Sequence, residues 1–144
     1  MNVTLLPAVE QLRLLEQRRI SPVELAEEHI RQIERLNPKL NAVIDFDPER
    51  VRSKAREIEA GPLAGLPITV KSSIEVKGYR CEIGSLLNRG HVAHEDAEAV
   101  ARLRRAGVTV LGTTNCPEFL MAYETDNLLY GRTNNPWNLE HSAG

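Results

Sequence analysis

The chain has 144 residues, 18 of them basic and 20 acidic, so it is about one domain long and close to neutral. This charge balance gives no reason to expect a surface for nucleic acid or for an anionic membrane. No apolar run approaches the roughly 18 residues of a membrane-spanning helix, and Cys81 and Cys116 have neither zinc-binding nor redox spacing, so we expect a reduced, cytoplasmic protein.

Residues 1–60 carry the signals of amphipathic helices. The first helix is predicted over residues 7–19. Ser21–Glu24 then combine an N-cap serine, a first-turn proline and a capping-box glutamate, so a second helix begins there, and Asn37–Pro38 is predicted to end it. The positions expected to face inward are Val9, Leu12 and Leu15 in the first helix and Leu25, His29, Ile33 and Leu36 in the second.

Two further elements complete this region. Residues 40–46 are a candidate short strand, and Asp47–Pro48 opens a third helix that Gly61–Pro62 closes. The residues of that helix expected to face inward are Val51, Ala55 and Ile58. We therefore predict a layer of helices that packs over the remainder of the chain.

From residue 61 onward, strands, loops and helices alternate. Leu66–Val70 is predicted to be a buried strand, because β-branched residues dominate it, and residues 72–94 form a long irregular stretch. Asp96 is predicted to cap a helix that Gly107 ends with a left-handed residue. The apolar face of that helix is Ala97, Val100, Ala101 and Leu103.

A second buried strand is predicted at Val108–Leu111. The order strand, helix, strand indicates a crossover unit with two parallel strands, and hence an α/β fold. Ligands of open α/β sheets bind beyond the carboxyl ends of the strands. Lys71 and the loop at Gly112–Asn115 should therefore face a common crevice.

Residues 131–144 have a loop-like composition and contain Trp137, the only tryptophan. We expect no regular element in this tail. Because a domain seldom ends on such an approach to further structure, we also expect the parent chain to be longer.

Several of these segments together resemble the amidase signature hydrolases. The lysine motif of that family resembles Gly65–Lys71, and two further blocks resemble Gly112–Phe119 and Gly131–Asn138. Shorter matches lie at Gly84–Ser85, Asp96–Ala97 and Arg105–Gly107, and the opening helices resemble the N-terminal helical layer of the family. The matches occur in the family order with compatible gaps, which is far more specific than any one of them.

The resemblance implies a fold and a catalytic residue. The chain would be the N-terminal part of the amidase signature fold, a mixed sheet flanked by helices, with residues 1–60 as the helical layer and 61–144 as the start of the α/β core. In that family a lysine, a bridging cis-serine and a nucleophilic serine form the catalytic triad. Lys71 takes the place of the lysine. The Gly/Ser-rich block that holds the bridging serine would begin near Gly144, so both serines would follow this chain, and Ser142 is neither of them.

A lysine base has to be neutral, although the reference pKa of a lysine side chain is about 10.4. Holding it neutral at about pH 7–8 takes about 4 kcal/mol from the environment, which burial at a strand end under covering loops supplies. Because the resemblance places part of that cover after residue 144, we expect Lys71 to be exposed and protonated in this chain.

The resemblance also implies substrate contacts. Residues after Asn115 line the acyl pocket in family members, so Phe119 and Leu120 are candidate substrate-binding residues; the alternative is that they are core residues. Ser72 stands where many relatives carry an aspartate, which removes a charge beside the lysine.

Other interpretations of single motifs are weaker. His91 and His94 have a loose metal spacing without a third placed ligand, so solvated loop histidines are the commoner explanation. Arg102, Arg104 and Arg105 lie opposite an apolar helix face, which indicates a solvated face more than a nucleic-acid patch.

Two further candidates concern nucleophiles. A serine–lysine dyad of Ser72 or Ser73 with Lys71 is disfavoured because neighbouring residues of an extended chain point to opposite faces. Cys116 has no base paired with it in sequence. His29 falls on an apolar helix face and is expected to be packed and hydrogen-bonded.

The resemblance thus implies a hydrolase that cleaves the carbon–nitrogen bond of a small linear amide, with neither cofactor nor metal, of which this chain alone would be inactive. One alternative is an A-subunit-like part of a glutamyl-tRNA(Gln) or aspartyl-tRNA(Asn) amidotransferase, although Pro117 stands where those proteins usually carry aspartate. Another is a non-catalytic, truncated fragment. A homodimer of the full-length protein is left open.

Overall fold

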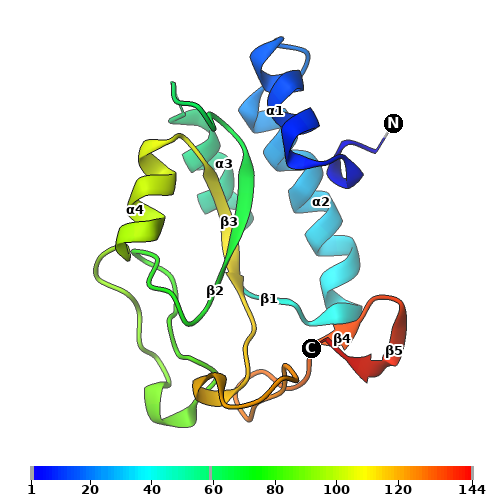
Figure 1. Ribbon diagram of the computed structural model, residues 1–144, viewed down its shortest axis with the longest axis vertical. Coiled ribbons are helices and arrows are strands. Elements are labelled where there is room, and N and C mark those ends of the chain that lie inside the picture. Colours follow the sequence, from blue (N-terminus) through cyan, green and yellow to red (C-terminus); the bar gives the residue numbers. More distant parts are fainter. Residues whose placement is uncertain (1, 59, 144) are drawn as a thin grey trace.

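The computed structural model describes residues 2–58 and 60–143. Its centre is a three-stranded sheet in the order β1–β3–β2, formed by β1 (Val43–Phe46), β2 (Pro67–Lys71) and β3 (Thr109–Thr114) (Figure 1). β2 and β3 are parallel, as predicted, whereas β1 runs antiparallel to β3. The sheet is therefore mixed, and the candidate strand within residues 40–46 belongs to it.

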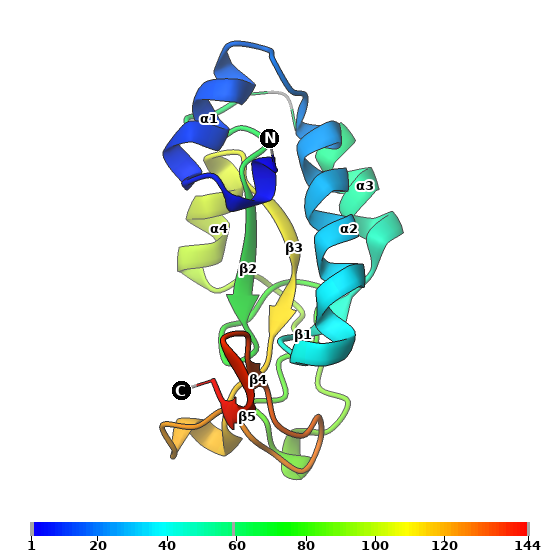
Figure 2. The ribbon, with the colours of Figure 1, turned by 90° about the vertical axis from the view of Figure 1, so that its right-hand side faces the viewer.

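Helices cover both faces of the sheet (Figure 2). α2 (Pro22–Leu40) and α3 (Pro48–Arg56) lie on one face, and α4 (Glu98–Arg105) lies on the other. α1 (Ala8–Glu16) contacts α2 through a hydrogen bond between Gln11 and His29. The remaining helical turns are short 3-10 helices: η1 (Val3–Leu5), η2 (Leu86–Asn88) and η3 (Glu118–Leu120).

Each face has its own hydrophobic cluster. The cluster on the α4 side is buried Val70, Val76, Tyr79, Val100, Val108 and Val110. The cluster on the α2–α3 side is Ala26, Ile30, Val51, Ala55 and Leu111. β3 supplies residues to both clusters, because successive side chains of a strand point to opposite faces.

The second helix begins as predicted and ends later than predicted. Ser21 and Glu24 form the full capping box. Pro38, however, lies inside the helix, which continues to Leu40 before Asn41 adopts a left-handed conformation. The missing N–H of Pro38 affects only the final turn, where Pro38 and Glu34 are both exposed and water can hydrate the freed carbonyl.

One predicted inward position of α1 is wrong. Val9 is 54% exposed and Gln11 is buried instead, because its amide donates to Leu6 O and meets His29. In α2 the core cluster uses Ala26 and Ile30, one residue after Leu25 and His29. Leu25 and His29 also face inward as predicted: Leu25 is completely buried, and half-buried His29 is hydrogen-bonded to Gln11.

Other boundaries and burial differ as well. α3 ends at Arg56, so Ile58 lies beyond it, and Gly61–Pro62 is not what closes it. Asp96 does not cap α4, because its carboxylate accepts a hydrogen bond from Lys77 N at 2.8 Å. The N-cap residue of α4 is Ala97, which makes no side-chain cap bond. β2 is only partly buried, with Thr69 exposed, because it lies at the edge of the sheet.

The predicted loop-like tail contains a β-hairpin. Its strands are β4 (Asn134–Asn135) and β5 (Asn138–Ser142), paired antiparallel. Arg132 braces β5 by donating to the carbonyls of Leu139 and Glu140 at 3.0 and 3.2 Å. A polar sequence can thus form a hairpin when one guanidinium satisfies carbonyls of an exposed strand.

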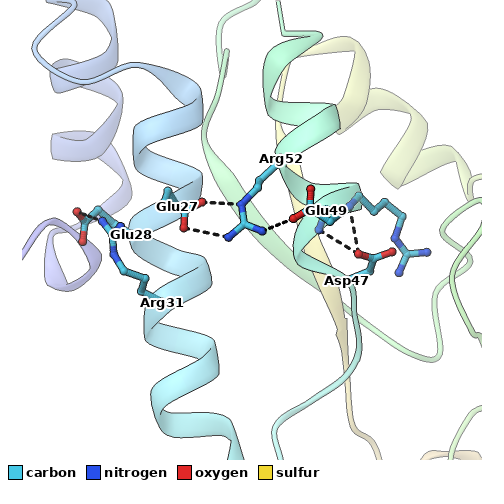
Figure 3. A network of polar contacts seen from close by, with 7 residues as sticks. Glu27, Glu28, Arg31, Asp47, Glu49 and Arg52 are labelled. Carbon is cyan, nitrogen blue, oxygen red and sulfur yellow. Dashed lines mark hydrogen bonds and ion pairs between the residues drawn. The ribbon is translucent and has the colours of Figure 1, made fainter.

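An arginine network joins α2 and α3 (Figure 3). Arg52 makes a two-point contact with Glu27, at 2.8 and 3.0 Å, and a third bond with Glu49 at 2.6 Å. The guanidinium lowers the pKa of Glu27, and the two carboxylates raise the pKa of Arg52. The side chains of Arg52 and Glu27 are 25% and 30% exposed and that of Glu49 is 79% exposed, so solvent screens part of the contribution of the network to stability.

None of the helices in the described ranges is both long and apolar enough to cross a membrane.

We expect Ile30→Ala to reduce the free energy of unfolding by about 2–5 kcal/mol, because it opens a cavity among fully buried side chains. Arg52→Ala, on the solvent side of the same two helices, should cost clearly less. Denaturant unfolding of both variants measures the difference. An equal loss would show that the ion network, not the apolar cluster, holds α2 against α3.

Burial lowers the pKa of His29, partly opposed by the charge of Glu28. The unfolded chain therefore takes up this proton first as the pH falls, so the free energy of unfolding should decline below about pH 6.5 until folded His29 is protonated too. The wild-type protein should show this decline and His29→Gln should not. His141→Gln, at an exposed position, is the matched control, and loss of the decline in that variant would contradict the assignment.

Candidate active site

Lys71 is the last residue of β2, at the carboxyl end of the parallel pair. It is in register with Thr114, and the next residue, Ser72, donates its N–H to Thr114 O at 2.9 Å. Lys71 therefore lies beside residues 112–115, as predicted, but Gly112–Thr114 continue β3 rather than forming a loop, so the predicted strand ended too early. The lysine side chain is exposed, as expected for this chain, and nothing in the described residues covers it in the manner of a base pocket.

Ser72 faces away from the lysine and is completely buried. Its Oγ lies 3.2 Å from Cys116 Sγ, and its carbonyl accepts a long bond from Ile83 N at 3.4 Å. An exposed Lys71 beside an inward Ser72 contradicts a dyad between them. Ser72 instead ties the end of β2 to two loops.

Cys116 is fully buried against Ser72, so a substrate has no access to its sulfur. Cys81 is also buried, and burial raises the pKa of its thiol. Both features disfavour thiolate chemistry.

A buried asparagine holds the loops beyond β3 together. Asn115 Nδ2 donates to Gly131 O at 3.0 Å and to Thr133 Oγ1 at 3.1 Å. Its Oδ1 accepts from Asn127 Nδ2 at 2.7 Å, and Asn127 Nδ2 also reaches Cys116 O at 2.9 Å. The loop after β3 is therefore fixed to residues 127–133.

The same region is anchored on α2. Asn41 donates to the carbonyl of Tyr130 at 2.6 Å, and Thr133 Oγ1 donates back to Asn41 O at 2.7 Å. The left-handed residue that ends α2 thus becomes a docking point for the C-terminal hairpin. In both ribbon views (Figure 1 and Figure 2) this hairpin lies at the end of the molecule toward which β2 and β3 point.

Phe119 and Leu120 lie in η3 at this end and are 42% and 47% exposed, so they are not core residues within the described chain. Both have left-handed backbones, with φ of 46° and 61°. A non-glycine residue in that region costs about 1–3 kcal/mol, and such strain tends to occur where a side chain must be presented. Their predicted role as substrate contacts stays a prediction.

The loop carrying Phe119 is packed tightly on Gly84. A Cβ on Gly84 would lie 2.7 Å from Cys116 O, and Phe119 N donates to Ile83 O at 3.0 Å. Ser85 Oγ then donates to Glu118 Oε1 at 2.7 Å. The Gly84–Ser85 pair therefore serves close loop packing.

The weak motifs receive structural explanations. His91 Nε2 lies 3.7 Å from Glu75 Oε1, and both line a hollow of about 480 Å³ with Cys81. Across residues 2–58 and 60–143, no three His, Cys, Asp or Glu side chains are grouped so that they could hold a metal ion.

The three arginines of α4 are paired with acids. Arg104 forms an ion pair with Asp96, and Arg102 and Arg105 both reach Glu98. This pairing fits a solvated helix face.

Sequence reasoning missed Asn127, Ser85 as a partner of Glu118, and the bonds that Asn115 makes. The contacts span 11 to 33 residues, so no periodic pattern marks them. The one local signal is the turn chemistry of Asn127, whose Oδ1 accepts from Leu129 N and Tyr130 N.

Comparison with known proteins decides the family. A family model described as Amidase matches residues 24–144. The chain belongs to the amidase family. Its α/β architecture, a mixed sheet with helices, matches the N-terminal part of amidase signature enzymes: a solved bacterial aryl acylamidase of that family is 30% identical, with a TM-score of 0.88 over 96% of this chain and 31% of the other.

Relatives with different activities match the amidase chain at similar sequence identity. An acylamidase of Rhodococcus erythropolis is 38% identical over 99% of this chain and 32% of its own length. The A-subunit of a glutamyl-tRNA(Gln) amidotransferase from Methylacidiphilum infernorum is 36% identical over 94% of this chain and 28% of its own. The amidase chain thus spans about a third of the length of the relatives it matches.

Asn115→Ala should loosen the loops around the strand ends, because it leaves buried partners unsatisfied at a cost of about 1–3 kcal/mol. Amide exchange over residues 115–133 should become faster, with exchange in α2 little changed. Asn138→Ala, at an exposed position of the hairpin, is the control. Unchanged exchange in Asn115→Ala would contradict the role of this side chain as the loop anchor.

Proposed function

We propose that this amidase chain is the lysine-bearing part of an enzyme that hydrolyses the carbon–nitrogen bond of a small linear amide. Lys71 is the base. The bridging and nucleophilic serines of the Ser–cisSer–Lys triad belong to sequence that follows Gly144 in the longer relatives. The chain by itself is inactive, because it supplies one of the three catalytic groups.

The observation that carries the proposal is the position of Lys71. The side chain leaves the carboxyl end of β2, where the parallel pair brings the ends of both strands to the same edge of the sheet, the edge at which ligands of α/β sheets bind. It is exposed, and Ser72 pins its backbone to β3. A lysine fixed in this way at an open strand end is available to a covering segment that desolvates it, and desolvation is what makes a lysine a base.

In this proposal the lysine accepts the proton that the nucleophilic serine loses through the bridging serine as the serine oxygen attacks the amide carbonyl. The proton then passes to the departing amine, and water hydrolyses the acyl-enzyme. Phe119 and Leu120 contact the acyl group, consistent with two apolar side chains held outward at the same end of the sheet.

The A-subunit of a tRNA-dependent amidotransferase is the second candidate, favoured by a relative of that kind at 36% identity. Pro117 supports the hydrolase, because the A-subunits of amidotransferases usually carry aspartate at this position. It is buried at the start of η3, where its fixed φ of −65° helps set the loop that bears Phe119.

The experiment is to supply the missing part. We define the completed protein as residues 1–144 joined to the C-terminal segment of the Rhodococcus erythropolis acylamidase, and we expect it to release amine from simple acyl amides. Lys71→Ala should remove nearly all turnover, a loss of about 10³-fold or more by analogy with other nucleophile–base systems. Lys77→Ala, another exposed lysine beyond the same strand, is the matched control and should keep activity.

Two outcomes would overturn the proposal. One is a folded completed protein whose Lys71→Ala variant retains most of its turnover. The other is catalytic activity of the 144-residue chain alone, which would mean that the reaction does not need the two serines. Sequencing the gene beyond codon 144 separates the hydrolase from the inert fragment, because the hydrolase requires a continuing frame with a Gly/Ser-rich block.

A further inference from the structure

The Phe119–Leu120 pair is held by side chains outside the expected triad. Ser85 is fully buried, and its hydroxyl donates to Glu118 Oε1 at 2.7 Å while accepting from Leu87 N at 3.2 Å. Glu118 is the first residue of η3 and directly precedes Phe119. A bond from a buried hydroxyl to a carboxylate is charge-assisted and therefore strong for its type.

The backbone on both sides of this bond is left-handed. Ile83 and Gly84 have φ of 51° and 63°, and Phe119 and Leu120 have φ of 46° and 61°. The two turns are joined by the bond from Phe119 N to Ile83 O. Bulky residues do not adopt this conformation without support, so relaxation of either turn would reorient the apolar side chains.

We call the bond between Ser85 and Glu118 the clamp; it also connects to Lys71. Ile83 N donates to Ser72 O, and Ser72 directly follows Lys71. The chain of contacts therefore runs from Glu118 through Ser85 and Ile83 to the end of β2.

We propose that Ser85 and Glu118 are positioning residues that set which acyl groups the site accepts, by holding Phe119 and Leu120 outward beside the lysine-bearing edge. The inference rests on the proposed amide hydrolysis. The preferred acyl group is apolar and long enough to contact both side chains, which expose 42% and 47% of their surface. Neither Ser85 nor Glu118 touches the reacting atoms.

The test uses the completed protein and nitroanilides with acyl chains of increasing length. Ser85→Ala and Glu118→Ala should raise KM for the long apolar substrates about tenfold, the effect of losing one charge-assisted hydrogen bond, while kcat stays close to that of the parent. The preference for long over short acyl chains should shrink accordingly. Glu118→Gln keeps an acceptor oxygen at the same place and should restore most of the preference.

A second measurement does not need turnover. In the 144-residue chain, hydrogen exchange over residues 117–121 should be faster in Ser85→Ala and Glu118→Ala than in the parent. Glu124→Ala, which removes an exposed carboxylate a few residues further on, should change neither KM nor exchange.

The outcomes separate the two proposals. Unchanged acyl preference in Ser85→Ala and Glu118→Ala overturns the clamp and leaves Lys71 in its role. A fall in kcat at constant KM also overturns it, because that pattern belongs to a group acting in the transition state. Activity retained in Lys71→Ala overturns the proposed mechanism while the KM and exchange results still decide the clamp.

Discussion

The parallel pairing of β2 with β3 determines where every candidate side chain lies. It brings Lys71 level with Thr114 and sends both strands into loops at the same edge. The bond from Ser72 N to Thr114 O continues the ladder with β3 one residue past Lys71, so the lysine backbone is held on its β3 side. A slip of one residue would turn Lys71 inward and Ser72 outward, because side chains alternate along a strand. The buried contact of Ser72 with Cys116 opposes such a slip.

The pairing itself relies on two helical layers and on one close backbone approach. Val70 and Val110 pack against α4, whereas Leu111 packs against α2 and α3. β1 reaches β3 only because Gly112 has no side chain: a Cβ there would lie 2.5 Å from Asp45 O. The N-terminal helices are thus joined to the sheet through β1 as well as through apolar packing.

Local chemistry was predictable from the sequence, and long-range polar contacts were not. The capping box at Ser21, the left-handed Gly107 and the parallel strands all follow from short patterns, whereas the exposure of Lys71 was expected from the family resemblance. The end of α2 was predicted too early at Pro38, because a proline in the final, solvated turn of a helix costs little free energy. The loop anchor Asn115 carries no such signal, since its partners lie 12 to 18 residues away and the fold alone brings them together.

The hairpin fixed by Arg132 has one more consequence. It holds Trp137 at the tip of a braced turn, 95% exposed, and the chain has no other indole. When it is excited at wavelengths that the three tyrosines do not absorb, the fluorescence of this tryptophan therefore reports the hydration of one spot on the molecule. A polypeptide that comes to lie over the hairpin of the amidase chain would therefore change the fluorescence of Trp137.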